Sequence, residues 1–253
     1  MNYLKNKTKI VLLLFAISFS TVNAQEIVSK ITYKKKSNII IDTIKQKATA
    51  GIFIKKMSNK MNNLEYTLKF NSFSSVFKET SRMTLDKDKN SLAVKLSKLL
   101  GGGSGIFYTN RKTNKIYHEK ELEAEVFLIE QNINNDWNVT QEKKNLGKYI
   151  CYKAIKNDTY VGSSGNLINR KIIAWYTPQI PFSYGPLNYS GLPGLILEIQ
   201  NDKVIFYATK IELYKKENLE NIPKPKKGIK ITQRKYDSIV IGLAKGLRKR
   251  IRN

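Results

Sequence analysis

The stretch LEYTLKF, residues 64–70, decides the fold class of this chain. Apolar side chains occupy every second position, from Leu64 to Phe70, and polar side chains stand between them. Successive side chains of a β-strand point to opposite faces, so this spacing predicts a strand with one buried and one solvated face. Other segments rich in Tyr, Phe, Ile and Val show similar patterning. They are residues 27–33, 73–79, 106–109, 115–118, 122–128, 137–141, 148–155, 171–177, 195–200 and 204–213.

The end of the chain follows a different pattern. Residues 223–228, PKPKKG, form a stiff basic linker, and Thr232 suits the N-cap of a helix. Beyond Thr232, apolar residues recur at helical steps of three and four. We therefore predict one α+β domain over residues 25–253: a predominantly antiparallel curved sheet or incomplete barrel, ending in a basic linker and an amphipathic helix within residues 222–253. The helical stripe consists of Tyr236, Ile239, Val240, Leu243, Leu247 and Ile251.

Composition excludes several classes of protein. The chain has 253 residues, of which 41% are hydrophobic and 26% charged, as in ordinary globular proteins. This excludes collagen-like, low-complexity and disulfide-rich scaffolds. The 45 basic and 20 acidic residues give a net charge of +25, which invites a nucleic-acid partner. Lys outnumbers Arg 38 to 7, however, and AT-rich codons would produce that surplus whatever the function.

The N-terminus predicts export. Lys5, Lys7 and Lys9 precede an apolar run at residues 10–19, and small residues at 22–24 suit cleavage before Gln25. This order is typical of a cleaved signal peptide, and the run is shorter than the ~20 residues that span a bilayer. We expect a mature protein without a transmembrane segment that is periplasmic, associated with the outer membrane or secreted. Export excludes nucleic acid as its partner.

The sequence offers little catalytic chemistry. His118 is the only histidine and Cys151 the only cysteine, so we expect no zinc site, no cofactor and no internal disulfide. Cys151 reads as a buried strand residue, and His118, beside Glu119, reads as a solvated, paired side chain. The glycine run 101–105 lacks the Lys and helix of a phosphate loop and suits a flexible connection. No residue is assigned a catalytic role.

Residues 175–196, WYTPQIPFSYGPLNYSGLPGLI, are the most unusual segment. They hold four of the six prolines, interleaved with glycines and aromatic residues. Proline fixes φ and glycine permits positive φ, so the segment is a series of specified turns. It is either a rigid surface that binds a ligand or partner, or a structural crossover that plugs the open end of a sheet. The candidate binding residues are Trp175, Tyr176, Pro181, Tyr184, Gly185, Pro186, Gly191, Leu192, Pro193 and Gly194.

The C-terminal segment from residue 223 to 253 carries eleven basic residues and one acidic residue. The predicted helix can pack by its apolar stripe while its basic side faces anionic lipid or polysaccharide. The alternative is a basic face that is only solvated. The candidate contacts with an anionic surface are Lys245, Arg248, Lys249, Arg250 and Arg252.

Several motifs carry a family resemblance. They are DWNV at Trp137, GKYICYKA around Cys151, AWYTPQIPFSYGP, the hexapeptide GLPGLI at residues 191–196, and PKKGIKIT near the tail. Together they resemble the GLPGLI family of exported bacterial proteins. VGSSGNLINRK, which ends near Arg170, departs from the more compact Gly-Arg element of that family. The family has no known function, so the resemblance implies an exported, mostly β protein and transfers no catalytic residue.

The leading hypothesis is a non-enzymatic binding or carrier module of the cell envelope. Lipid, glycan or an envelope protein is its expected partner. The order of strands and helix is similar to that of half-barrel lipoprotein carriers, which is a fold-level analogy. A structural or assembly factor for envelope complexes, and a hydrolase that uses two carboxylates, stay open as alternatives.

Overall fold

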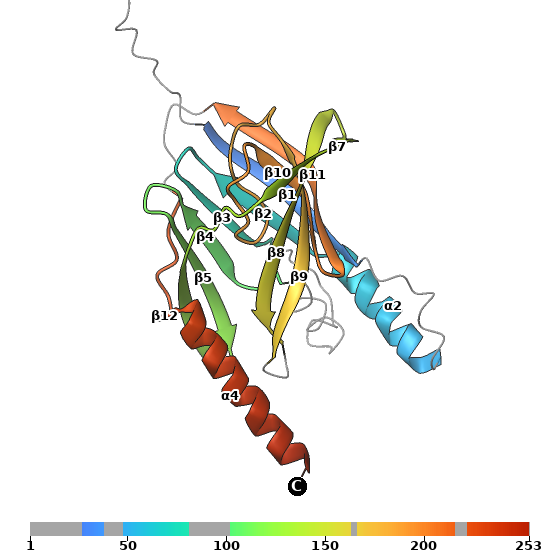
Figure 1. Ribbon diagram of the computed structural model, residues 1–253, viewed down its shortest axis with the longest axis vertical. Helices are drawn as coiled ribbons and strands as arrows, with labels where there is room; N and C mark the ends of the chain where they lie inside the picture. The colour runs from blue at the N-terminus through green and yellow to red at the C-terminus, as the bar shows by residue number, and fades with distance from the viewer. Residues whose placement is uncertain (1–26, 38–47, 81–101, 163–165, 216–221, 253) are drawn as a thin grey trace, which may run out of the picture.

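The computed structural model describes residues 27–37, 48–80, 102–162, 166–215 and 222–252. The predicted signal peptide, residues 1–24, lies outside the described residues. Across the described residues the chain is mostly antiparallel sheet with two helices (Figure 1).

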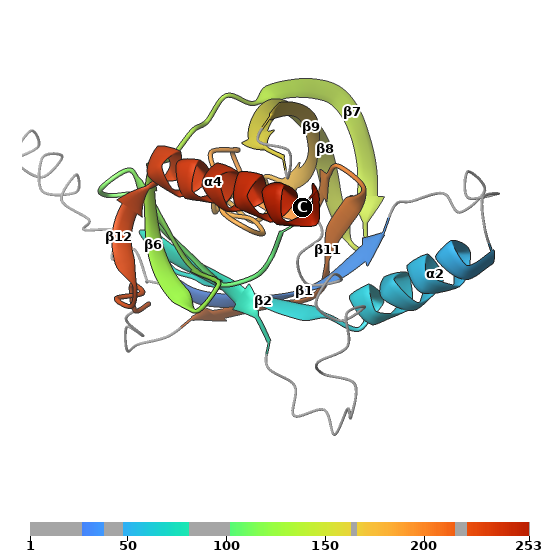
Figure 2. The same ribbon diagram turned by 90° about the horizontal axis from the view of Figure 1, so that it is seen from below.

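Twelve strands form one sheet in the order β12-β6-β5-β4-β3-β2-β1-β11-β10-β9-β8-β7. All described pairs are antiparallel except β12 with β6. The sheet is curved and is not closed into a barrel, since β12 and β7 are its two edges (Figure 2). This confirms the predicted fold class. The strands are β1 (Ile27–Ser37), β2 (Glu65–Phe70), β3 (Ser74–Glu79), β4 (Ile106–Asn110), β5 (Lys115–Leu122), β6 (Glu125–Asn132), β7 (Asn138–Leu146), β8 (Tyr149–Val161), β9 (Leu167–Thr177), β10 (Leu195–Asn201), β11 (Val204–Lys215) and β12 (Ile229–Thr232).

The alternating run that predicts the fold is β2. Tyr66, Leu68 and Phe70 are fully buried, whereas Lys69 is exposed. The register with β1 places Tyr33 opposite Tyr66, so the buried side chains of both strands share one face of the sheet. That inner face carries the main hydrophobic core.

One predicted strand is in fact two. Residues 122–128 contain a hairpin turn at Glu123 and Ala124, whose φ angles are 58° and 105°. The turn interrupts the alternation of side chains, because Leu122 of β5 pairs with Glu125 of β6 and so lies on the face opposite to Leu128. Such turns normally show Asn or Gly, and this one lacks that signal.

The helices are α2 (Ala48–Asn62) and α4 (Gln233–Arg252). The sequence pattern did not predict α2, which places Met57 and Met61 against the sheet, or β12 inside the basic tail. The start of α4 confirms the predicted cap, because the Lys235 N–H donates a hydrogen bond of 3.3 Å to Thr232 Oγ1. Among the described residues no helix is long and apolar enough to cross a membrane.

The one cysteine and the one histidine of the chain have different surroundings. Cys151 is fully buried in β8, as predicted, and burial raises the pKa of its thiol to about 11. His118 is not a solvated, paired side chain. It stacks on Phe107 with ring centres 3.8 Å apart and its Nε2 lies 2.9 Å from the Ser104 carbonyl oxygen. Burial lowers its pKa to about 4, because β4 and the segment before it cover the ring.

Candidate functional site

The Pro/Gly loop, residues 178–194, connects β9 to β10 and folds back onto the start of β10. The Leu195 N–H donates to the Ile180 carbonyl oxygen at 3.0 Å, and the Ile196 N–H donates to that of Tyr184 at 2.9 Å. The Tyr33 hydroxyl donates to the Ile196 carbonyl at 2.6 Å from the inner face of β1. These hydrogen bonds fix the loop against the central strands.

One side of this loop belongs to the core. Ile180, Tyr184, Leu187 and Leu192 are buried in the main hydrophobic cluster. The ring of Tyr184 lies 5.5 Å from that of Phe70 on β2. These side chains fill the inner face of the sheet, as expected of a structural crossover.

The candidate binding residues therefore divide by exposure. Pro181, Gly191 and Pro193 are exposed and form a rim, while Trp175 is half-buried on β9. The others are buried and contribute to packing. These buried residues are Tyr176, Tyr184, Gly185, Pro186, Leu192 and Gly194.

Two glycines of the GLPGLI hexapeptide allow this close packing. A side chain at Gly194 would collide with the backbone carbonyl of Thr177, and one at Gly191 would collide with the amide of Asn135. Gly191 also has φ of +95°, which side-chain-bearing residues rarely adopt. The hexapeptide thus brings the loop into contact with β9 and with the segment that joins β6 to β7.

Two adjoining cavities open along the exposed rim, with volumes of about 240 and 380 Å³. Arg111, Ser183 and Gly191 border both of them, and we call the combined site the Arg111 cleft. Its further lining is mainly polar at one end and Pro-rich at the other. These residues are Asn114, Ile133, Asn135 and Ser190 at the first end, and Pro181, Leu192, Pro193 and Gly194 at the second.

Arg111 supplies the charge of the cleft. Arg111 lies in the turn between β4 and β5. Its backbone N–H donates a hydrogen bond of 2.8 Å to the Phe73 carbonyl oxygen. Its guanidinium carbon is 5.9 Å from the centre of the Tyr184 ring. Within the described residues no carboxylate lies within ion-pair distance of it. The guanidinium is therefore available to an anion.

The remaining polar groups are held in place by the loop. The Gly191 N–H donates to Ser183 Oγ at 2.8 Å, and the indole N–H of Trp137 donates to the Ser190 carbonyl at 2.8 Å. The Ser190 hydroxyl is buried and, in the described part of the chain, has no hydrogen-bond partner. The cleft offers a cation, amides and hydroxyls on a fixed backbone.

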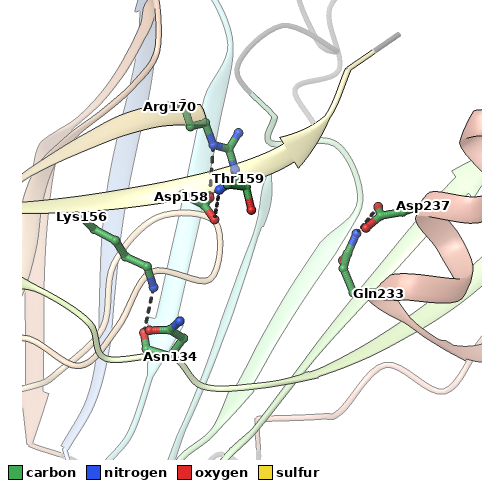
Figure 3. A network of polar contacts seen from close by, with 7 residues as sticks. All are labelled: Asn134, Lys156, Asp158, Thr159, Arg170, Gln233 and Asp237. Atoms are coloured by element: carbon green, nitrogen blue, oxygen red, sulfur yellow. Dashed lines mark hydrogen bonds and ion pairs between the residues drawn. The ribbon is translucent and has the colours of Figure 1, made fainter. Parts of the chain in front are cut away.

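Polar contacts also hold side chains of β8 and β9 (Figure 3). Lys156 donates to the Asn134 carbonyl at 3.1 Å, next to the cleft residue Asn135. Arg170 donates to Asp158 at 2.6 Å, so its charge is paired. The Gln233–Asp237 contact in the same view is internal to α4.

The basic candidates lie on α4, away from this cleft. Lys245 is exposed, and the side chains of Arg248, Lys249, Arg250 and Arg252 lie outside what the structure describes. The helix packs on the sheet mainly through Tyr236, whose ring lies 5.8 Å from that of Phe127. The described residues contain no group of three His, Cys, Asp or Glu side chains that could hold a metal ion.

Comparison with known proteins identifies a related fold but no activity. A family model described as "Protein of unknown function (Porph_ging)" matches residues 166–198, the stretch that contains β9 and the Pro/Gly loop. The crystal structure of PNGF-II in space group C2 superposes with a TM-score of 0.50 at 17% sequence identity. The fold is shared with part of PNGF-II.

That alignment covers 85% of this chain and 32% of the PNGF-II chain, so this protein spans about a third of the length of PNGF-II. A second crystal form, in space group P21, aligns with a TM-score of 0.49, 18% identity and coverage of 84% and 33%. A comparison with curated proteins finds no match.

The rim residues were predicted from the sequence, whereas Arg111 was not. Arg is rare in a chain with 38 Lys and 7 Arg, which is a weak signal in retrospect. Only the tertiary fold brings the turn at residues 110–115 beside residues 181–193.

Proposed function

We propose that this protein is an exported, non-enzymatic binding module of the GLPGLI family that binds an acidic glycan in the Arg111 cleft. The observation that carries the proposal is the position of Arg111, which borders both cavities beside the exposed rim and has no acidic partner among the described residues. A guanidinium forms charge-assisted hydrogen bonds with carboxylate or sulfate groups, and these are about twice as strong as neutral ones.

The rest of the lining favours a glycan over a lipid. Asn114, Asn135 and Ser183 offer amide and hydroxyl groups that both donate and accept, which suits the hydroxyls of a sugar. The exposed Pro181 and Pro193 add small apolar surfaces of the kind that a sugar ring covers. An acyl chain would instead require a deeper apolar cavity.

The predicted signal peptide supports export, and the basic tail supports a position close to an anionic surface. We propose that α4 contributes peripheral contact with anionic lipid through Lys245 and the basic residues that follow it. Vesicles with 30% anionic lipid test this by co-sedimentation at low salt. The full chain is expected to co-sediment and a chain that ends at Thr232 is not. Equal co-sedimentation by both would remove α4 from the proposal.

A carboxylate-based hydrolase has less support. Such an enzyme needs two acidic side chains on opposite sides of the scissile bond. The residues that line the Arg111 cleft include neither Asp nor Glu. An assembly factor stays an outcome of the binding test below.

Calorimetric titration with tetragalacturonate, a polyanionic tetrasaccharide, and with its neutral methyl ester tests the glycan proposal at 150 mM salt. The acid is expected to bind at least tenfold more tightly than the ester, since one charge-assisted hydrogen bond contributes ~1.5–3 kcal/mol. Arg111→Gln should remove that preference, whereas Arg234→Gln, an exposed arginine on α4, should keep it. If both glycans fail to bind, or if Arg111→Gln binds like the wild type, the proposal is wrong. Recovery of a specific envelope protein in place of a glycan would then favour the assembly role.

A further inference from the structure

A further cavity lies beside the β7–β8 turn. Its volume is about 380 Å³, and it opens between the β7–β8 turn and strands β10, β11 and β1. Lys36 and Tyr207 border it, on the face opposite to that where Lys35 and Phe206 are buried. We call it the hairpin groove. It shares no lining residue with the Arg111 cleft.

Two ammonium groups flank the hairpin groove. The Lys36 Nζ lies 5.0 Å from the centre of the Tyr207 ring, and the Lys148 Nζ lies 5.5 Å from that of Tyr149. In the described ranges of the chain neither lysine has a carboxylate within ion-pair distance. Both are held over aromatic rings by cation–π attraction, which orients them without neutralising their charge.

The acidic residue of the groove is already neutralised. Glu198 accepts a hydrogen bond of 2.7 Å from Lys144, whose Nζ lies 4.3 Å above the Trp175 ring. This contact removes the charge that would otherwise compensate Lys36 and Lys148. The groove therefore has a positive potential, in a protein with a net charge of +25.

The floor of the groove is apolar. Leu197 is 2% exposed, and Leu146, Ala208 and Ile211 pack against the main core beside it. Tyr149 and Tyr207 contribute flat walls. A volume near 380 Å³ lies within the range of pockets for small molecules, and such pockets combine apolar walls with a few orienting polar groups.

We propose that the hairpin groove binds a small aromatic carboxylate. The ring of the ligand lies on Leu197 between the tyrosines, and its carboxylate is placed between the ammonium groups of Lys36 and Lys148. A neutral ring compound lacks the anion, and a small inorganic anion lacks the apolar surface, so each makes only half of these contacts. This inference does not depend on the glycan proposal.

Titration of the full chain with 1-naphthoate, followed by ligand fluorescence, tests this site against the isosteric neutral 1-naphthalenemethanol. The carboxylate is expected to bind at least tenfold more tightly than the alcohol. The double variant Lys36→Met/Lys148→Met should lose that preference, while Lys203→Met, an exposed lysine in the β10–β11 turn, should keep it.

Chemical-shift mapping on the wild-type protein gives a second measurement that does not depend on the folding of any variant. Saturating 1-naphthoate should shift the amides of residues 146–149 and 207–209 and leave those of residues 181–193 unchanged. Equal affinity for the alcohol, wild-type affinity in the double variant, no binding at millimolar ligand, or shifts outside the groove would each overturn the proposal.

Discussion

Two regions of this sheet are covered in different ways. Over the central strands an irregular loop supplies the second layer, and its side chains Tyr184 and Leu192 are each 1% exposed. Near the β12 edge a regular amphipathic helix lies on β6 and β12, and among its described side chains Tyr236 is buried while Ile239 and Val240 are half-buried (Figures 1 and 2). The irregular segment is the better packed of the two.

The difference between the Pro/Gly loop and α4 shows that a segment without regular secondary structure can form a layer of the hydrophobic core. Fully burying a large apolar side chain contributes ~1.5–3 kcal/mol, and the Pro/Gly loop places several such side chains on the inner face of the sheet. The turns set by its prolines and glycines leave its other face exposed, and there it borders the Arg111 cleft. One segment thus stabilises the fold and also borders the cleft in which we propose that a glycan binds, so the two interpretations of residues 175–196 are compatible.

Of the substitutions that test this difference, one at Gly194 should have the largest effect on stability. We expect Gly194→Val to destabilise the protein by more than about 4 kcal/mol, because the new side chain would collide with the Thr177 carbonyl and force the loop off β9. Urea denaturation measures this. The matched change in the other region is Gly242→Ala in α4, where an added methyl group meets nothing, and it should stabilise by up to ~1 kcal/mol. A mild effect at Gly194 would mean that the loop is not held as described.

Truncating one apolar side chain in each region compares their packing directly. Leu192→Ala should cost about 3 kcal/mol, within the range for fully buried leucines, whereas Ile239→Ala should cost about 1 kcal/mol because Ile239 is only half-buried. Chemical denaturation of both variants under the same conditions gives the two losses in free energy of unfolding, which can then be compared. Equal costs would contradict the difference between the two regions.

The buried Lys35 makes the free energy of unfolding depend on pH. Burial lowers the pKa of Lys35 to about 7, although the nearby Glu79 acts in the opposite direction. Between pH 7 and the ordinary pKa of lysine the unfolded chain binds a proton that the folded chain has released, so stability increases with pH. From pH 7 to 8.5 we expect this residue to add about 1.5 kcal/mol to the free energy of unfolding.

Denaturation of Lys35→Met over the same pH range isolates that effect. The increase should disappear in this variant and persist in Lys203→Met, whose side chain is exposed at the β10–β11 turn. An unchanged pH dependence in Lys35→Met would show that Lys35 stays protonated in the folded protein.

The sequence predicted the features that depend on local pattern. The period of two identified β2, because one face of that strand is buried along its whole length, and Thr232 marked the start of α4. The pattern of α2 was too weak, since among its described side chains Met57 and Met61 are buried and Ile52 is 69% exposed. The turn at Glu123 and Ala124 was not predicted, because neither residue is the Asn or Gly that normally marks a two-residue hairpin turn.

The candidate site was predictable only in part. Proline and glycine indicated that residues 178–194 have fixed turns, but an irregular segment has no period, so the sequence could not assign Tyr184 to the core and Pro181 to the rim. Arg111 lies about seventy residues before Ser183 in the chain. Their proximity depends on the pairing of β3, β4 and β5 and on the return of the loop, which no local pattern encodes.

Native-state hydrogen exchange tests most directly the claim that the Pro/Gly loop is a layer of the core. The Leu195 and Ile196 amides donate to carbonyls of the loop itself, at Ile180 and Tyr184. The account predicts that both exchange only through global unfolding, as slowly as the amide of Leu68 in β2, while amides of α4 such as that of Leu243 exchange much faster. Exchange of Leu195 and Ile196 at the rate of the α4 amides would contradict it.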